Sequence, residues 1–299
     1  MTFISYAQNF EDVMLWRALK HINNGFYIDI GANDPVVDSV SLVFYENGWR
    51  GVHVEPAMQY SNKLRQARPD EIVEQAAIGN GDGFFTFYEF ENTGLSTADQ
   101  NNAQIHKQAG YSCIESQVQI LSLDTLFDRI GQRVIHWLKV DVEGLEKSVL
   151  ESWRESTARP WVLVIESTRP LTQDEDYAGW EPLVLAKGYQ FAYFDGLNRF
   201  YVYSGQSYLL NAFKIPPNIF DDFMLSGTAC QPFHQLIGHK VKQAEAKAQQ
   251  AEAKAQQAEA KAQQAENVLD AVYNSRSWRY TALLRWAEEK LRIIRENFR

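Results

Sequence analysis

Five short apolar runs along residues 26–166 constrain the fold of this chain more than any other feature. They are FYIDI at 26–30, GVHVE at 51–55, IVEQAAI at 72–78, VIHWLKVD at 134–141 and WVLVIE at 161–166. Segments of helical periodicity separate them, and this alternation predicts an α/β fold with a parallel sheet. Because the runs are nearly continuous in Val, Ile, Leu and aromatic residues, we expect helices on both faces of the sheet. The expected helices span 8–20, 57–66, 144–152 and 177–187.

A hairpin is predicted to close the sheet. The segment GYQFAYFDGLNRFYVYS at 188–204 places Asp195 and Gly196 between two aromatic strands, a pattern typical of an antiparallel terminal hairpin. With 45% apolar and 13% aromatic residues among 299, the chain has ample material for a core. We assign residues 1–225 to this doubly wound domain.

Composition changes abruptly near residue 240. A linker is expected at 226–240, and three copies of QAEAKAQ then begin a predicted Ala-rich helix at 241–272. Its small apolar residues alternate steps of four and three, as in a heptad seam: Ala244, Ala248, Ala251, Ala255, Ala258, Ala262, Ala265, Leu269 and Val272. The pairs Lys247–Glu252 and Lys254–Glu259 favour a parallel coiled coil, and hence a homo-oligomer. The alternative is a solvated single helix, because an alanine seam buries little area.

The last segment, 273–299, is predicted to be a basic amphipathic helix. From Ser275 onward it carries seven Arg or Lys and three Glu, a charge of +4 in a chain whose formal charge is −9. Apolar residues at helical spacing beside arginines are typical of a helix lying on a lipid surface, so peripheral membrane contact through 275–299 is expected. The alternative is packing on a partner subunit or on the acidic main domain.

Charge and composition narrow the function classes. The acidic balance and the lack of a basic patch in the first 270 residues argue against nucleic-acid binding. Two cysteines make no disulfide framework, and the start MTFISYAQNF lacks a secretory-signal profile, so cytoplasmic residence is expected. No window holds the roughly 20 apolar residues of a membrane span.

The strand end FYIDIGANDP carries the sharpest local signal. Gly31 permits close approach of backbone to a ligand at the first turn of a doubly wound sheet. The pattern G-x-G-x-x-G is absent, which argues against NAD or FAD. Asp29 and Asn33 can instead take an ammonium or hydroxyl group. The alternative role of Asp29 is to cap the next turn.

Carboxylates end three further apolar runs. Glu55 follows Gly31 by 24 residues and can accept both hydroxyls of a ribose. Asp141 and Glu143 follow another strand and can orient a substrate, act as a base or join a divalent metal. Glu166 closes a third run and is a further candidate. Asp141 is alternatively an N-cap. No His-Cys cluster indicates zinc, no resident metal is expected, and His53 and His136 are interpreted as core residues.

Taken together, these motifs resemble those of the FkbM family of S-adenosylmethionine-dependent methyltransferases. The resemblance is carried by SYAQNFEDVML, DIGANDPVVDSVSLVFYENGWRGVHVEP, AAIGNGDG, LSLDTL, LKVDVEGLEKSVL and VLVIES, in family order. It implies a class I, Rossmann-like sheet of seven strands, bound S-adenosylmethionine and O-methyl transfer to a sugar or related hydroxyl.

The resemblance also implies roles for individual residues. Asp29, Gly31 and Asn33 belong to the loop under the methionine portion of the cofactor, and Glu55 holds its ribose. Ala77 and Ile78 line the adenine, and Asp141 faces the sulfonium. Gln8, Asp38 and Ser39 close the pocket. The family does not fix a base, so Asp141, Glu143 and Glu166 stand as catalytic candidates on position and chemistry alone.

The tail SRSWRYTALLRW resembles tails of enzymes encoded with bacterial surface-polysaccharide assembly. It implies a glycan acceptor on a lipid carrier at the inner face of the cytoplasmic membrane. A rival interpretation is an inactive methyltransferase-like scaffold that recruits assembly enzymes through its coiled coil. A second rival, a nicotinamide-dependent oxidoreductase, is disfavoured by the missing glycines.

Overall fold

A computed structural model of the chain describes residues 3–81, 83–90, 96, 100–169 and 172–297. The chain divides into two compact units, Met1–Gly238 and His239–Arg299, which are considered separately below. Residues 298–299 of the predicted basic helix lie outside the described part.

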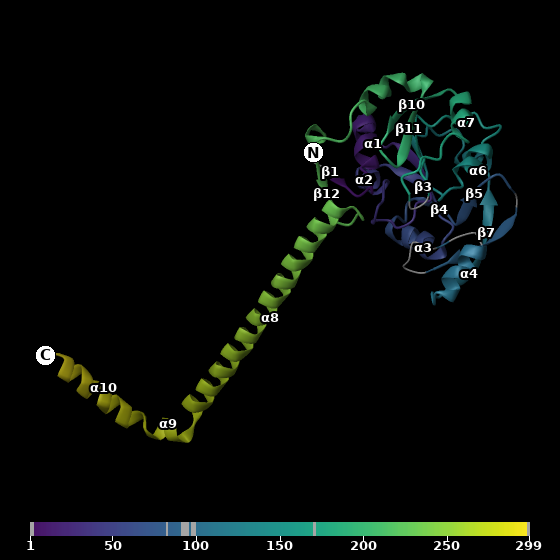
Figure 1. Ribbon diagram of the computed structural model, residues 1–299. Helices are drawn as coiled ribbons and strands as arrows, with labels where there is room; N and C mark the ends of the chain where they lie inside the picture. Colours follow the sequence, from purple (N-terminus) through teal and green to yellow (C-terminus); the bar gives the residue numbers. More distant parts are fainter. Residues whose placement is uncertain (1–2, 82, 91–95, 97–99, 170–171, 298–299) are drawn as a thin grey trace. The chain divides into compact units, whose positions relative to one another are not determined.

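A seven-stranded sheet forms the centre of the first unit, in the order β10-β11-β9-β8-β2-β3-β4 (Figure 1). The five adjacent strands β9, β8, β2, β3 and β4 run parallel to one another. Strand β11 lies antiparallel to both of its neighbours, β9 and β10. The expected α/β architecture is therefore confirmed, and the hairpin is present as β10 and β11. The strands are β2 (Phe26–Ile30), β3 (Arg50–Val54), β4 (Ile72–Glu74), β8 (Trp137–Val140), β9 (Val162–Glu166), β10 (Tyr189–Phe194) and β11 (Asn198–Tyr203).

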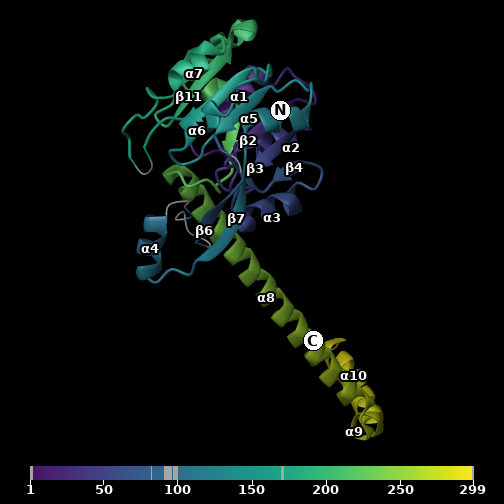
Figure 2. The same ribbon diagram turned by 90° about the vertical axis from the view of Figure 1, so that its right-hand side faces the viewer.

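The run at 72–78 does not form one strand, contrary to the prediction. Its first part, β4, extends the large sheet at an edge where Ile72 is exposed, whereas Ala76 and Ile78 are buried. The second part, β5 (Ala76–Ile78), instead pairs with β7 (Ile114–Leu121), which also pairs with β6 (Phe84–Glu89). This small sheet lies beside α4 (Gln100–Gln108) (Figure 2).

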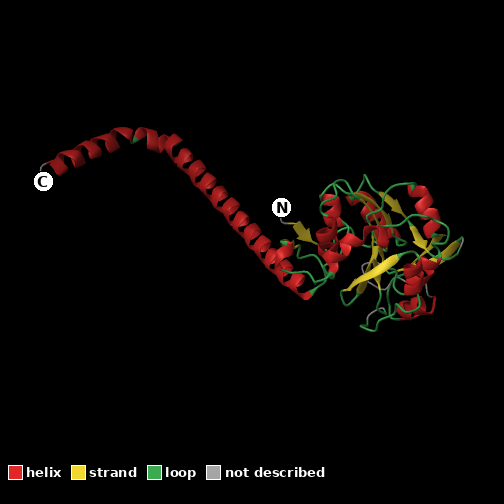
Figure 3. Ribbon diagram, turned by 90° about the horizontal axis from the view of Figure 1, so that it is seen from above, coloured by secondary structure: helices red, strands yellow, loops and turns green. Residues whose placement is uncertain are grey.

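Helices surround the large sheet (Figure 3). Those expected at 8–20, 57–66, 144–152 and 177–187 are present in shortened or shifted form, and two further ones were not predicted. All six are α1 (Glu11–Leu19), α2 (Leu42–Glu46), α3 (Met58–Ala67), α5 (Leu123–Ile130), α6 (Glu146–Glu151) and α7 (Glu181–Ala186). The 3-10 helices η1 (Ser204–Phe213) and η2 (Ile219–Asp221) follow, and β12 (Phe223–Leu225) pairs in parallel with β1 (Phe3–Ser5).

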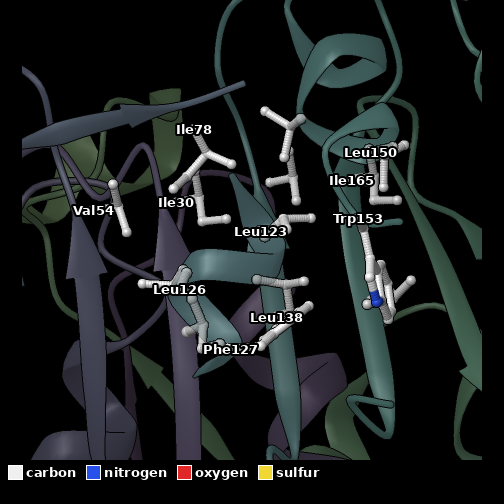
Figure 4. Packing of buried hydrophobic residues seen from close by; sticks show 14 of the residues in the cluster. Ile30, Val54, Ile78, Leu123, Leu126, Phe127, Leu138, Leu150, Trp153 and Ile165 are labelled. Atoms are coloured by element: carbon white, nitrogen blue, oxygen red, sulfur yellow. The ribbon is translucent and has the colours of Figure 1, made fainter. Parts of the chain in front are cut away.

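The large sheet buries side chains on both faces. Along β2, Ile28 and Ile30 belong to one apolar cluster and Tyr27 to another, as alternation in a strand requires. The first cluster includes Leu126 of α5 and Leu150 of α6 (Figure 4). Two-sided burial fixes the register, so the residues at the carboxyl ends of the strands are firmly placed.

The second unit is helical. It contains most of α8 (Pro232–Asn274), then α9 (Arg276–Tyr280) and α10 (Ala282–Asn297). Helix α8 begins inside the segment 226–240 for which a linker is expected, because Pro232 suits a first helical turn and His234 is buried in the first unit. Every described side chain from 239 to 296 is exposed or half-exposed. None of the described helices is long and apolar enough to cross a bilayer.

Candidate functional site

The turn after β2 brings three strand ends together. Gly31 has φ +77°, and a Cβ at this position would overlap the carbonyl oxygen of Asp141. The amide of Gly31 donates to the carbonyl of Val54 at 2.9 Å, and the amide of Asp141 donates to the carbonyl of Ile30 at 3.1 Å. Only glycine fits so close an approach with this φ. The ends of β2, β3 and β8 therefore meet at one edge of the sheet.

Glu55 connects the loops after β2 and β3. It is buried, its Oε2 accepts from the amide of Asn33 at 2.8 Å, and its Oε1 accepts from the amide of Ala57 at 2.8 Å. Asn33 reaches this position with a left-handed φ of 51°. Burial raises the pKa of Glu55 to about 7. Since a carboxylate offers about four acceptor positions, each oxygen retains one for a further donor.

The three candidate catalytic carboxylates lie around one cavity. Asp141, Glu143 and Glu166 line a hollow of about 440 Å³ together with Gln8. The sequence did not single out the other lining residues, which are Thr168, Thr172, Gln173 and Leu197. The cavity thus gathers the N-terminal segment, the end of β8 and the loop after β9 around acidic and hydroxyl groups.

Lys139 contacts a candidate site residue and was not predicted from the sequence. Its buried Nζ donates to Oδ2 of Asp141 at 2.6 Å. Burial opposes its charge, but the carboxylates of Asp141, Asp29 and Glu11 outweigh this and raise its pKa. The detectable signal was a lysine within an otherwise apolar strand run, because a buried lysine needs an anionic partner.

The carboxylates differ in their surroundings. Burial, followed by the charges of Asp141 and Glu143, raises the pKa of Glu166 to about 9, so Glu166 is protonated at neutral pH. Burial and Asp141 also raise the pKa of Glu143. Among the described residues, nothing donates to the buried Oε2 of Glu166 or Oδ1 of Asp29. Asp141, paired with Lys139, and protonated Glu166 are therefore chemically unlike groups in one cavity.

The residues predicted to close the pocket have mainly structural contacts. Asp38 accepts from the amide of Cys230 at 2.9 Å, and Ser39 accepts from Nη2 of Arg68 at 3.0 Å. Gln8, which lines the cavity, donates to Sγ of Cys230 at 3.5 Å. Contact of Asp38 and Ser39 with a cofactor remains a prediction.

The predicted adenine residues lie on β5. Ile78 is packed in the core (Figure 4), whereas Ala77 is half-buried. Lining of the adenine by these two residues stays a prediction, and Ala77 is the more accessible of them.

A buried polar cluster holds the loop between Pro35 and Ser41. Nη2 of Arg68 donates to the carbonyl of Pro35 at 2.8 Å, and its Nη1 donates to the Ser41 hydroxyl at 2.8 Å. The carboxylate of Glu71 balances the charge of Arg68, since its Oε2 lies 3.6 Å from Nη1 of Arg68. The same oxygen lies 2.8 Å from Nε2 of His53. His53 is thus a core residue, as predicted.

Comparison with known proteins identifies the family. The profile of the methyltransferase FkbM domain matches residues 29–191, more than half of the chain. The chain belongs to the FkbM methyltransferase family. The FkbM match contains Gly31, Glu55, Asp141 and Glu166 but not Gln8.

Other comparisons add little. No curated protein matches the sequence. The crystal structure of Streptomyces venezuelae DesVI aligns with 66% of this chain and 94% of its own, at 9% identity and a TM-score of 0.33.

Proposed function

We propose that this protein is an S-adenosylmethionine-dependent O-methyltransferase acting on a sugar hydroxyl of a bacterial surface glycan or its lipid-linked precursor. The observation that carries the proposal is the meeting of Gly31, Glu55 and Asp141 at one sheet edge beside an acidic cavity. Family membership supports methyl transfer. The strand order with one antiparallel member supports a class I, Rossmann-like arrangement.

The residues present fit the cofactor. A Cβ at Gly31 would overlap the carbonyl oxygen of Asp141, so glycine is what lets the ends of β2 and β8 meet beside the cavity, and Glu55 retains acceptor positions for two ribose hydroxyls. Asp29 has a buried oxygen without a donor, which suits the ammonium of an amino-acid portion. When bound, S-adenosylmethionine supplies a methyl group activated by a sulfonium.

The cavity residues divide the remaining work. A sugar hydroxyl in the cavity meets Asp141, whose position Lys139 fixes, and Asp141 can accept its proton. Protonated Glu166 cannot act as a base at neutral pH, but it can donate a hydrogen bond to a neighbouring sugar oxygen. Glu143 is a second acceptor at the rim. Orientation of the hydroxyl toward the methyl group supplies most of the expected rate gain.

Isothermal titration with S-adenosylmethionine and S-adenosylhomocysteine tests the proposal. The full chain should bind both, and Glu55→Ala should weaken binding at least about tenfold, or about 1.4 kcal/mol. Glu74→Ala is a matched control, because Glu74 lies on the neighbouring strand and pairs with Arg129. Absence of binding by the folded protein would refute the proposal and favour the scaffold.

The helical unit is proposed to hold the enzyme as a parallel homo-oligomer against the inner face of the cytoplasmic membrane. The exposed heptad seam, ending in Leu269 and Val272, supports association through α8. On α10, Leu291 and Ile294 are exposed, and Arg292 supplies positive charge for lipid phosphates. This arrangement would bring a lipid-linked glycan within reach of a tethered domain.

A further inference from the structure

A second and larger cavity lies in the first unit. It has a volume of about 770 Å³, within the range of roughly 300–1,000 Å³ that is usual for small-molecule sites. It is lined by residues 9–10, by Tyr193 and Asp195 at the end of β10, and by residues 216–219, 222–223 and 225. All of these positions lie outside residues 29–191, where the family profile matches. The cavity is therefore built from parts of this chain that the family match does not include.

The lining combines aromatic rings with oxygen-rich groups. Phe10 and Phe223 lie with ring centroids 5.5 Å apart, and Tyr193 also lines the hollow. Asn218 and Asp195 contribute amide and carboxylate oxygens, which also accept from the backbone amides of residues 220, 197 and 198. Such a surface suits a ligand with apolar C–H faces and many hydroxyl donors, because rings pack on the former and oxygens accept from the latter.

Charge excludes other common ligands. The lining residues include two carboxylates, Asp195 and Asp222, and no Lys, Arg or His. Phosphates and carboxylates are bound by cationic side chains or by exposed backbone amides at helix N-termini. A nucleotide, a sugar phosphate or an acidic sugar would meet like charge here. The chemistry fits a neutral, polyhydroxylated molecule.

The larger cavity adjoins the carboxylate cavity along the chain. Asn9 lines the first and Gln8 the second; likewise Asp195 lines the first and Leu197 the second. Nδ2 of Asn9 donates to the carbonyl of Asp195 at 3.0 Å, which ties these two segments together. The two cavities are therefore lined by neighbouring residues of the same two segments.

We propose that the larger cavity is a subsite for neutral sugar residues of the acceptor, next to the residue whose hydroxyl is methylated in the smaller cavity. This inference rests on the proposed function, since it assumes a glycan acceptor. It assigns substrate selection to the lining residues, at positions 9–10, 193, 195, 216–219, 222–223 and 225.

Saturation-transfer NMR on the full chain tests the subsite. The probes are the methyl glycosides of mannose, rhamnose, galactose and N-acetylglucosamine, with glucose 1-phosphate and glucuronic acid as charged comparators. The informative variants are Ile219→Ala and Tyr193→Leu. Phe220→Ala is the matched control, because Ile219 and Phe220 are both 88% exposed but only Ile219 lines the cavity.

At least one neutral glycoside should receive saturation, and both cavity variants should weaken its binding about fivefold or more while Phe220→Ala leaves it unchanged. Equal binding of glucose 1-phosphate, or no neutral probe bound, overturns the subsite. Titration with S-adenosylmethionine is run on the same samples. If the cofactor binds and no glycoside does, the subsite alone fails; if glycosides bind and the cofactor does not, the methyltransferase proposal fails.

Discussion

Replacing Gly31 by alanine should destabilise the first unit by an amount that can be worked out from the turn. A non-glycine residue at φ +77° costs roughly 1–3 kcal/mol. The new Cβ would also lie closer to the carbonyl of Asp141 than the 3.0 Å that real Cβ atoms respect, and relieving this overlap costs about 1–3 kcal/mol more. The expected total is roughly 2–6 kcal/mol.

Gly131→Ala separates the two contributions. Gly131 has φ +71°, but a Cβ there meets nothing within 4 Å. Urea unfolding followed by fluorescence should therefore show that Gly31→Ala costs about 1–3 kcal/mol more than Gly131→Ala, or about 2–12 °C in Tm for a domain of this size. Cofactor affinity should fall only in Gly31→Ala. Equal destabilisation by the two substitutions would refute the reasoning, because an overlap with neighbouring backbone is expected only at position 31.

Four further predictions concern charge and the helical unit. Lys139→Met should lower the free energy of unfolding by about 3–5 kcal/mol at neutral pH, because it leaves Asp141 without its cation; a loss below about 1 kcal/mol in urea unfolding contradicts this. The pKa of Glu166 is about 9 in the folded chain and about 4.3 when unfolded, so the folded state retains the proton between these values and stability falls as pH rises through them. The stability of the Glu166→Gln variant should not fall in this way, so its urea midpoint should rise relative to that of the wild type between pH 6 and pH 9. A difference in urea midpoint that stays constant over this range would show that Glu166 is ionised. Deleting 275–299 should abolish flotation of the protein with phosphatidylglycerol vesicles, and unchanged flotation would count against membrane contact by this segment. Deleting 241–272 should convert the oligomer to a monomer in analytical ultracentrifugation, and unchanged sedimentation would count against a coiled coil.

The core strands could be predicted from the sequence because each is buried on both faces. Runs such as 26–30 and 161–166 therefore contain hardly any polar residue, and they can be recognised as strands without knowing which strands they pair with. The run at 72–78 misled for the same reason. Apolar composition predicts strands here, but it does not say that β4 and β5 belong to two different sheets or that β4 lies at an exposed edge.

The candidate site was predictable where a residue follows a strand directly. Strand ends placed Asp141 and Glu166 in one cavity. Lys139 could have been found from the local sequence, because its ion-pair partner Asp141 lies only two residues further along the chain; the added charge of Glu11 on α1 depends on the tertiary fold and could not. The larger cavity was missed because residues 9 and 195 become neighbours only through the tertiary fold.

The contact between Gln8 and Cys230 gives the protein a natural reporter position. Cys113 is the only other cysteine in the chain, so Cys113→Ser leaves one thiol for an environment-sensitive dye. Cys230 is exposed, and since burial and Asp38 raise the pKa of its thiol, mildly alkaline buffer favours labelling. Gln8 lines the carboxylate cavity, so the emission of such a dye would follow molecules entering it. Candidate acceptors could then be screened by fluorescence before any product is known.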